Sequence, residues 1–118
     1  MPELHKLMPV LRVLQKRGFV VGLVTDGRMS GASGVVPCAI HMTPEAIVGG
    51  FLGKIKDGDY LTIDATRGNL AIDKSEDELN ARVSTPNGET DSTFGRGLFS
   101  QMRNGLSGSE QGASFFSF

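Results

Sequence analysis

The first half of the chain alternates between apolar runs and polar, glycine-rich segments. Apolar residues at helical spacing predict a helix over residues 9–17, and Gly18 after its last turn is typical of a left-handed cap. Residues 19–24 are apolar without alternation, which predicts a central strand covered on both faces. Residues 35–40 form a second short apolar run, and the polar loop of residues 25–34 separates the two. The stripe of the helix that is predicted to be buried consists of Val10, Leu11 and Leu14.

The middle of the chain predicts short elements joined by tight turns. Pro44 is predicted to begin a short helix, because proline is favoured in the first turn. A hairpin is expected between residues 52–56 and 60–64, since the Asp-Gly pair at residues 57–58 is a preferred turn. A further turn is expected at residues 66–69.

The last third of the chain combines one clear helix start with less regular segments. Ser75 and Glu78 form a capping box, which predicts that a helix begins there. Residues 84–92 are predicted to form a surface loop. Residues 94–102 carry apolar side chains at helical spacing, and the phenylalanine-rich tail, residues 107–118, is expected to pack or pair.

Length and composition favour one small domain of mixed α and β structure that is mainly β. The 118 residues are predicted to form a single domain, residues 1–118, because a chain of this size can bury well over half of its unfolded surface. Sixteen glycines, few aromatic residues and no tryptophan indicate many tight turns between short elements. Short strands with a few helices fit this composition better than a helical bundle does.

Charge and cysteine content narrow the partners and the compartment. The formal net charge is -1, so no basic surplus attracts nucleic acid. No apolar stretch reaches the roughly 18 residues of a membrane span, and no signal-peptide pattern begins the chain. The single cysteine, Cys38, cannot form an internal disulfide, which suits a reducing compartment. We therefore expect a cytoplasmic domain with no nucleic-acid partner and no membrane partner.

The loop of residues 25–34 is the best candidate for chemistry in the chain. Its glycines would let backbone N–H groups converge on an anion, and Arg28, Ser30 and Ser33 could add donors. The loop matches neither the P-loop pattern nor the Gly-x-Gly-x-x-Gly pattern of dinucleotide-binding proteins. A glycine-rich turn that joins two buried strands explains the same residues.

Several single residues have a structural explanation beside a functional one. Ser30 would need activation to act as a nucleophile or base, and most serines in such loops are turn residues. His41 is more often a packed, hydrogen-bonded residue than a ligand. Glu3 and His5 could bind a divalent metal, but two ligands are too few. Cys38 is interpreted as a small hydrophobic residue.

These segments, in order, resemble the dihydroxyacid and 6-phosphogluconate dehydratase family over nearly the entire chain. Met1-Pro2-Glu3 resembles the end of the family's Gly-Met-Pro-Glu segment, and residues 41–46 resemble its His-x-Ser/Thr-Pro-Glu-Ala block. Residues 95–99 and 110–113 resemble the 6-phosphogluconate branch rather than the dihydroxyacid branch. The motif that carries most of the resemblance is Val24-Thr25-Asp26-Gly27-Arg28-Met29-Ser30-Gly31.

The resemblance implies a hydro-lyase that converts 6-phospho-D-gluconate to 2-keto-3-deoxy-6-phosphogluconate in the Entner–Doudoroff pathway. It implies that Ser30 takes the C2 proton and that Glu3 helps to ligate a divalent cation such as Mg²⁺. A 4Fe-4S cluster would act as the Lewis acid at the C3 hydroxyl, with its cysteines and most cation ligands outside this chain. The residues expected to bind substrate or support the loop are Asp26, Gly27, Arg28 and Gly31.

The resemblance also implies a fold and partners. The fold would be a small barrel-like body with flanking helices, similar to the swivelling domain of aconitase. The chain would be the carboxy-terminal domain, a fragment of a larger dehydratase that also has an amino-terminal domain and forms a homodimer. It is expected to be inactive alone.

Two alternatives remain open. In the first, the chain belongs to a relative with the same serine chemistry that acts on a dihydroxyacid or another sugar acid. Arg96 and Arg103 could contact a substrate phosphate, but they are also explained as solvated residues on a helix face. In the second, the chain is a non-catalytic domain that only packs on a partner, and the loop of residues 25–34, called the serine loop below, is an anion-binding turn.

Overall fold

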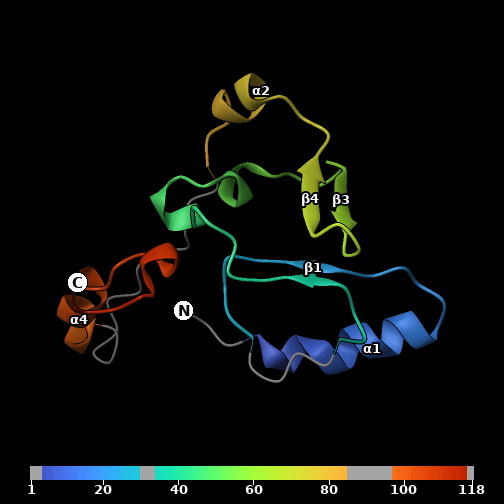
Figure 1. The fold of residues 1–118 in the computed structure, drawn as a ribbon, viewed down its shortest axis with the longest axis horizontal. Coiled ribbons are helices and arrows are strands. Elements are labelled where there is room, and N and C mark those ends of the chain that lie inside the picture. The colour runs from blue at the N-terminus through green and yellow to red at the C-terminus, as the bar shows by residue number, and fades with distance from the viewer. Residues whose placement is uncertain (1–3, 30–33, 85–96, 117–118) are drawn as a thin grey trace.

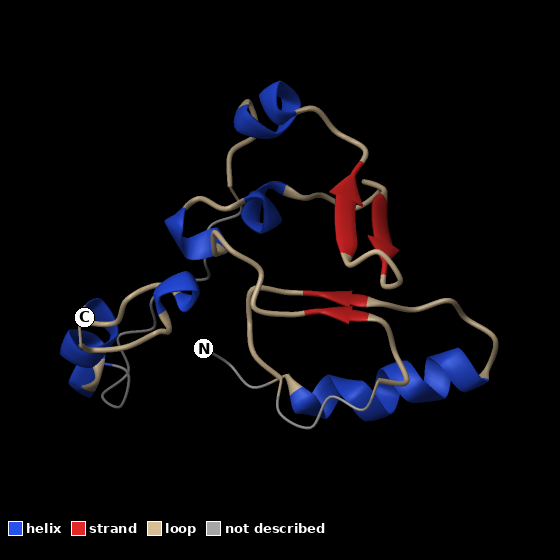
Figure 2. Ribbon diagram, in the orientation of Figure 1, coloured by secondary structure: helices blue, strands red, loops and turns tan. Residues whose placement is uncertain are grey.

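Two small sheets and several short helices form an open arrangement in the computed structural model, which describes residues 4–29, 34–84 and 97–116. Figure 1 shows α1 along one side of the parallel pair β1–β2, while β3–β4 lies on the other side. Figure 2 shows the same short strands joined mostly by loops. The Cα radius of gyration is 16.1 Å, whereas a compact domain of this length has about 13.5 Å. In chain order the elements are η1 (His5–Leu7), α1 (Met8–Lys16), β1 (Leu23–Val24), β2 (Cys38–Ala39), η2 (Ala46–Val48), η3 (Phe51–Lys54), β3 (Leu61–Asp64), β4 (Asn69–Ile72), α2 (Glu76–Asn80), α4 (Ser100–Asn104) and η4 (Ser109–Gln111).

The helix predicted over residues 9–17 is present as α1 and ends as expected. Pro9 lies in its first turn, where a missing N–H costs nothing. Gly18 has a φ of +92° and donates its N–H to the carbonyl oxygen of Gln15 at 3.0 Å. Phe19 donates to the carbonyl oxygen of Leu14 at 3.2 Å, so the two bonds form a Schellman motif.

The buried face of α1 differs from the predicted stripe at one position. Met8 is buried, and Leu11 packs beside it against the core, while Leu14 is half-buried. Val10 is 59% exposed, so its predicted burial is wrong. Two residues along a helix rotate the side chain by about 200°, which places Val10 opposite Met8. Val13 is also exposed on this outer side.

The two apolar runs form much shorter strands than predicted. β1 and β2 pair in parallel, with Leu23 opposite Cys38. The predicted coverage of residues 19–24 on both faces is wrong in the described structure, because Phe19 is 60% exposed and Val20 is fully exposed. Pro37 precedes β2 and has no N–H to donate, so a longer ladder is not available to this run.

The hairpin forms one turn later than predicted. β3 and β4 pair antiparallel, with Leu61 opposite Ile72, around the turn that was expected at residues 66–69. The predicted pairing of residues 52–56 with residues 60–64 is wrong. η3 occupies most of the first segment, and its Gly53 is buried with no room for a side chain beside Ser84. The turn at residues 57–58 is present but only redirects the chain.

A half-buried ion pair joins the chain between η3 and β3 to the segment after α2. The guanidinium of Arg82 donates to both carboxylate oxygens of Asp59, at 3.0 Å for Nη2 to Oδ1, and also to the carbonyl oxygen of Lys54 at 3.2 Å. Because Arg82 binds both carboxylate oxygens and a carbonyl oxygen, the ion pair fixes the orientation of its two side chains.

The predicted capping box of Ser75 and Glu78 begins α2, since both of its reciprocal hydrogen bonds are present.

The carboxy-terminal part of the chain is only partly regular. The helical spacing of residues 94–102 agrees with the structure only in part, because α4 begins at Ser100 and residues 94–96 lie outside the described residues. Leu98 and Met102 are exposed, so their apolar spacing does not correspond to burial within the described residues. The surface loop predicted over residues 84–92 lies outside the described residues apart from Ser84.

The fold class is mixed α and β, as predicted, but no closed barrel forms among residues 4–29, 34–84 and 97–116. The two ladders are separate two-stranded sheets, so the predicted mainly β, barrel-like body is wrong for this part of the chain. The side chain of Ile63 in β3 approaches the chain just before β1, since its Cδ1 lies 3.3 Å from where a Cβ of Gly22 would be. A barrel needs hydrogen-bonded neighbours all round, which two-residue strands cannot supply. No described helix is long and apolar enough to cross a membrane.

Asp59→Asn should loosen the link between the chain before β3 and the segment after α2. The Arg82 guanidinium holds the pKa of Asp59 at about 2, below its usual 3.8. A lowered carboxylate pKa stabilises the folded state above the unfolded pKa, and this contribution is lost as pH falls through about 2. Hydrogen exchange at β3 and α2 should therefore be faster in Asp59→Asn at neutral pH, with the difference shrinking below about pH 4.

Asp57→Asn is the matched control, because Asp57 is exposed in the same turn. Equal exchange in the two variants would contradict a specific role for Asp59.

Candidate functional site

The loops that follow β1 and β2 lie side by side, held by backbone hydrogen bonds. Thr25 N–H donates to the carbonyl oxygen of Ala39 at 2.9 Å, and Met42 N–H donates to that of Thr25 at 3.1 Å. His41 N–H donates to the carbonyl oxygen of Gly27 at 3.1 Å. The carboxyl ends of parallel strands are a common place for ligand sites in α/β proteins, and here two polar loops meet at those ends.

Asp26 supports this arrangement with its side chain. Its Oδ2 accepts the backbone N–H of Ala46 at 2.8 Å, which caps the first residue of η2. The helix predicted to begin at Pro44 therefore begins two residues later, as a single 3₁₀ turn, because Glu45 is still extended. A carboxylate from a distant loop satisfies the helix end instead of a residue next to it.

Gly27 allows the amino-terminal segment to approach the loop. Its N–H donates to Thr25 Oγ1 at 2.9 Å. A Cβ at this position would lie 3.1 Å from Thr25 Oγ1 and 3.2 Å from Leu4 Cδ1. Both separations are tighter than ordinary side-chain contacts, so Gly27 is fitted to its neighbours by size.

Met29 anchors the motif in the core. It is 7% exposed and packs with Met8 and Val36. Arg28 is exposed, and its carbonyl oxygen accepts the N–H of Leu4 at 3.3 Å. Met29 is not among the site residues predicted from the sequence, although an apolar residue inside a polar glycine-rich loop is a signal for such an anchor.

Three of the predicted site residues, Ser30, Gly31 and Glu3, lie outside the described residues. Two residues directly beside them in the chain are described. Met29 directly precedes Ser30, and Leu4 directly follows Glu3.

His41 has an uncommon backbone conformation next to the loop. Its φ is +54°, in the left-handed region that non-glycine residues rarely adopt. It is exposed, so the interpretation of His41 as a packed residue is wrong. The left-handed turn directs its N–H to Gly27, which a sequence pattern could not reveal. Strained backbone conformations of this kind are often found at functional sites, where the surrounding structure keeps them in place.

The described residues offer neither a reactive thiol nor a metal-ligand cluster. Cys38 Sγ donates to the carbonyl oxygen of Val36 at 3.1 Å, and burial raises the pKa of the thiol. It therefore stays protonated at neutral pH, in agreement with its interpretation as a small hydrophobic residue. Within residues 4–29, 34–84 and 97–116, no three His, Cys, Asp or Glu side chains are grouped to hold a metal ion.

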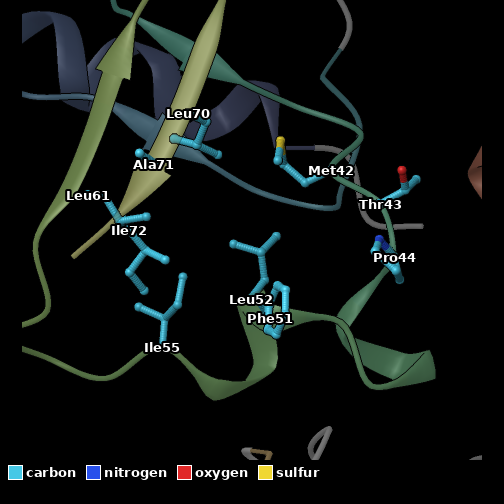
Figure 3. A pocket seen from close by; sticks show the side chains of 10 residues that line it. All are labelled: Met42, Thr43, Pro44, Phe51, Leu52, Ile55, Leu61, Leu70, Ala71 and Ile72. Atoms are coloured by element: carbon cyan, nitrogen blue, oxygen red, sulfur yellow. The ribbon is translucent and has the colours of Figure 1, made fainter. Parts of the chain in front are cut away.

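An apolar hollow of about 160 Å³ lies between η3 and the β3–β4 hairpin (Figure 3). Its walls are almost entirely hydrocarbon, with residues 42–44 closing one side. A charged ligand would lose hydration there without finding donors. The hollow is therefore a worse candidate than the loops for a polar substrate. Its other lining residues are Phe51, Leu52, Ile55, Leu61, Leu70, Ala71 and Ile72.

Glu45 links the region next to the loops to the carboxy-terminal segment. Its Oε1 accepts the backbone N–H of Ser109 at 2.7 Å. This hydrogen bond holds the pKa of Glu45 below its usual range. The contact spans 64 residues of sequence, and nothing in the sequence pattern indicates it.

Comparison with known proteins finds similarity over nearly the whole chain. Residues 1–113 match the family model described as dihydroxy-acid/6-phosphogluconate dehydratase C-terminal. The phosphogluconate dehydratase of Pseudomonas aeruginosa is 53% identical over 98% of this chain, and that of Escherichia coli K12 is 52% identical over all of it. The dihydroxy-acid dehydratase of Dinoroseobacter shibae is 36% identical over 95% of the chain. The chain spans about a fifth of the length of these relatives.

His41→Val should destabilise the protein more than His41→Asn. A β-branched residue in the left-handed region costs about 1–2 kcal/mol, whereas asparagine adopts this region readily. Denaturant unfolding should show this difference in the free energy of unfolding between the two variants. Lys6→Val, at an exposed position in η1, controls for the general effect of valine. Equal stability of the two His41 variants would show that the left-handed backbone is not needed.

Proposed function

The chain belongs to the dihydroxy-acid/6-phosphogluconate dehydratase family, and on this premise we propose that it is the carboxy-terminal active-site domain of a phosphogluconate dehydratase. The observation that carries the substrate assignment is the higher identity to phosphogluconate dehydratases than to the dihydroxy-acid dehydratase. The enzyme would be a hydro-lyase of the Entner–Doudoroff pathway.

The proposed reaction removes water from 6-phospho-D-gluconate. A proton leaves C2 and a hydroxyl leaves C3, which gives an enol and one water molecule. The enol then takes up a proton at C3 and becomes the ketone 2-keto-3-deoxy-6-phosphogluconate. The difficult step is the removal of a weakly acidic C2 proton, which needs a positioned base.

We assign the role of this base to Ser30, acting as an alkoxide. Its support is the fixed position of the chain on its amino-terminal side. Met29 is buried, Gly27 is hydrogen-bonded to His41, and Asp26 is hydrogen-bonded to Ala46, so the loop is held at three points before the serine. A base held by surrounding packing needs little reorganisation to reach the substrate. Asp26, Gly27, Arg28 and Gly31 would support the loop or contact the substrate.

The metal requirement would be met mainly outside this chain. We propose Glu3 as one ligand of a divalent cation such as Mg²⁺, and the bond between Leu4 and Arg28 supports this, since it joins the segments that carry Glu3 and Ser30. The described residues do not fit a 4Fe-4S cluster, because Cys38 is the chain's one cysteine and no ligand group surrounds it. The cluster would have to be held by the rest of the enzyme and would polarise the C3 hydroxyl there.

The remaining part of the same enzyme is the proposed partner. Val10, Val13, Phe19 and Val20 expose apolar surface around α1 and β1, which is typical of a face that packs on another domain. We propose that an amino-terminal domain covers it in a cytoplasmic homodimer. A likeness of this domain to the swivelling domain of aconitase is part of the same proposal.

Ser30→Ala tests the proposal in the full-length enzyme with its cluster intact, under anaerobic conditions. Removal of the base should lower kcat for 6-phosphogluconate by about 100-fold or more, with cluster absorbance unchanged. Ser33→Ala, in the same loop, is the matched control and should keep near-normal turnover.

Other results would separate the alternatives. Near-normal turnover of Ser30→Ala would support a domain that only packs. If the unaltered enzyme does not act on 6-phosphogluconate but does act on a dihydroxyacid or an unphosphorylated sugar acid, the substrate assignment is wrong.

A further inference from the structure

We propose that Glu45 is a positioning residue that holds the turn of residues 108–112 next to η2, whose first N–H is bound by Asp26, and that this turn contributes to substrate binding. The inference rests on the function proposed above. It assigns to the carboxy-terminal segment a part in the same site.

The turn is a preformed unit. Gln111 and Ala113 each donate an N–H to the carbonyl oxygen of Gly108 at 3.0 Å, and Gly112 donates to that of Ser109 at 3.0 Å. Gly112 has a φ of +87°, a conformation that suits glycine. The turn therefore keeps its own shape and needs only to be held in place.

Glu45 supplies the hold. Its carboxylate accepts the N–H of Ser109 at 2.7 Å, the short distance typical of a charge-assisted hydrogen bond. A Cβ on Gly108 would lie 3.7 Å from both carboxylate oxygens of Glu45, so glycine lets the turn come close. Figure 1 shows η4, near the red end of the colour bar, beside the green η2 that Glu45 precedes.

The same point in the chain is also bound to the serine loop. The next residue, Ala46, donates its N–H to Asp26 Oδ2 at 2.8 Å. The carbonyl oxygen of Glu45 accepts the N–H groups of Val48 and Gly50, at 3.1 and 2.9 Å, so its backbone is fixed. Two consecutive residues thus connect the serine loop and the carboxy-terminal turn, and a shift of one segment is passed to the other.

The exposed groups on the turn suit the hydroxyl groups of a sugar acid. Glu110 and Gln111 bring exposed polar side chains to the turn, whereas Ser109 Oγ is buried. Such groups can bind substrate hydroxyls in both ground and transition states. Their loss should therefore raise KM more than it lowers kcat.

Glu45→Ala and Ser109→Pro remove the two sides of this hydrogen bond in the full-length, cluster-containing enzyme. Proline at Ser109 deletes the N–H but fits the first position of η4, and Gly108 already has the extended backbone (φ -62°, ψ 165°) that precedes proline. Each variant should raise KM for 6-phosphogluconate about tenfold and leave kcat within about threefold. Hydrogen exchange of residues 106–114 should be faster in both.

The two changes should be non-additive, since they break one interaction. Ser109→Ala, which keeps the N–H, and Glu76→Gln, which removes an exposed charge from α2, are the controls and should keep near-normal KM. Glu45→Gln, which keeps an acceptor without the charge, should lie between the native enzyme and Glu45→Ala.

Native KM in Ser109→Pro, or faster exchange of the turn without a change in KM, would overturn the proposal. If Glu45→Ala does not fold, Ser109→Pro alone decides. Failure of the native enzyme to dehydrate 6-phosphogluconate would instead contradict the proposed function, which separates the two ideas.

Discussion

Backbone hydrogen bonding beyond the carboxyl ends of β1 and β2 is the constraint on which the rest of the site depends. The parallel ladder itself has only two residues in each strand. The backbone hydrogen bonds of Thr25, His41 and Met42 continue the pairing into both loops, so each loop holds the other in place. The left-handed backbone of His41 is needed for this pairing, because it directs the N–H at Gly27. A strained residue is retained where the bonds it permits outweigh its cost.

The described residues of the site are held in place without a large core. The buried apolar residues of the described chain are few, namely Met8, Met29, Val36 and Leu79. Met29 belongs to both the core and the motif, so burial of one side chain fixes the residue next to the proposed base. The exposed apolar surface around α1 and β1 is typical of a face that packs on another domain, and the chain spans about a fifth of the length of the phosphogluconate dehydratase from Pseudomonas aeruginosa.

Carboxylates do structural work in this domain that their sequence context does not suggest. Asp26 and Glu45 each accept a backbone N–H from a segment far along the chain, 20 and 64 residues away. The carboxylate oxygens of Asp59 accept hydrogen bonds from Nη1 and Nη2 of Arg82, and Oδ2 also accepts the backbone N–H of Lys56. In each case the carboxylate joins two segments that are not neighbours in the sequence.

The amino-acid sequence alone determined the features that depend on neighbours in the chain. The Schellman end at Gly18, the capping box of Ser75 and Glu78, the turn before β4 and the mixed α and β class were predictable, because local backbone preferences decide them. The motif around Ser30 and the family followed from residue identity. Only the tertiary structure decided which strand pairs with β3, which face of α1 is buried, the left-handed turn at His41 and the contact of Glu45 with Ser109. These depend on contacts between segments distant in sequence, where several pairings have similar local preferences and packing selects one of them.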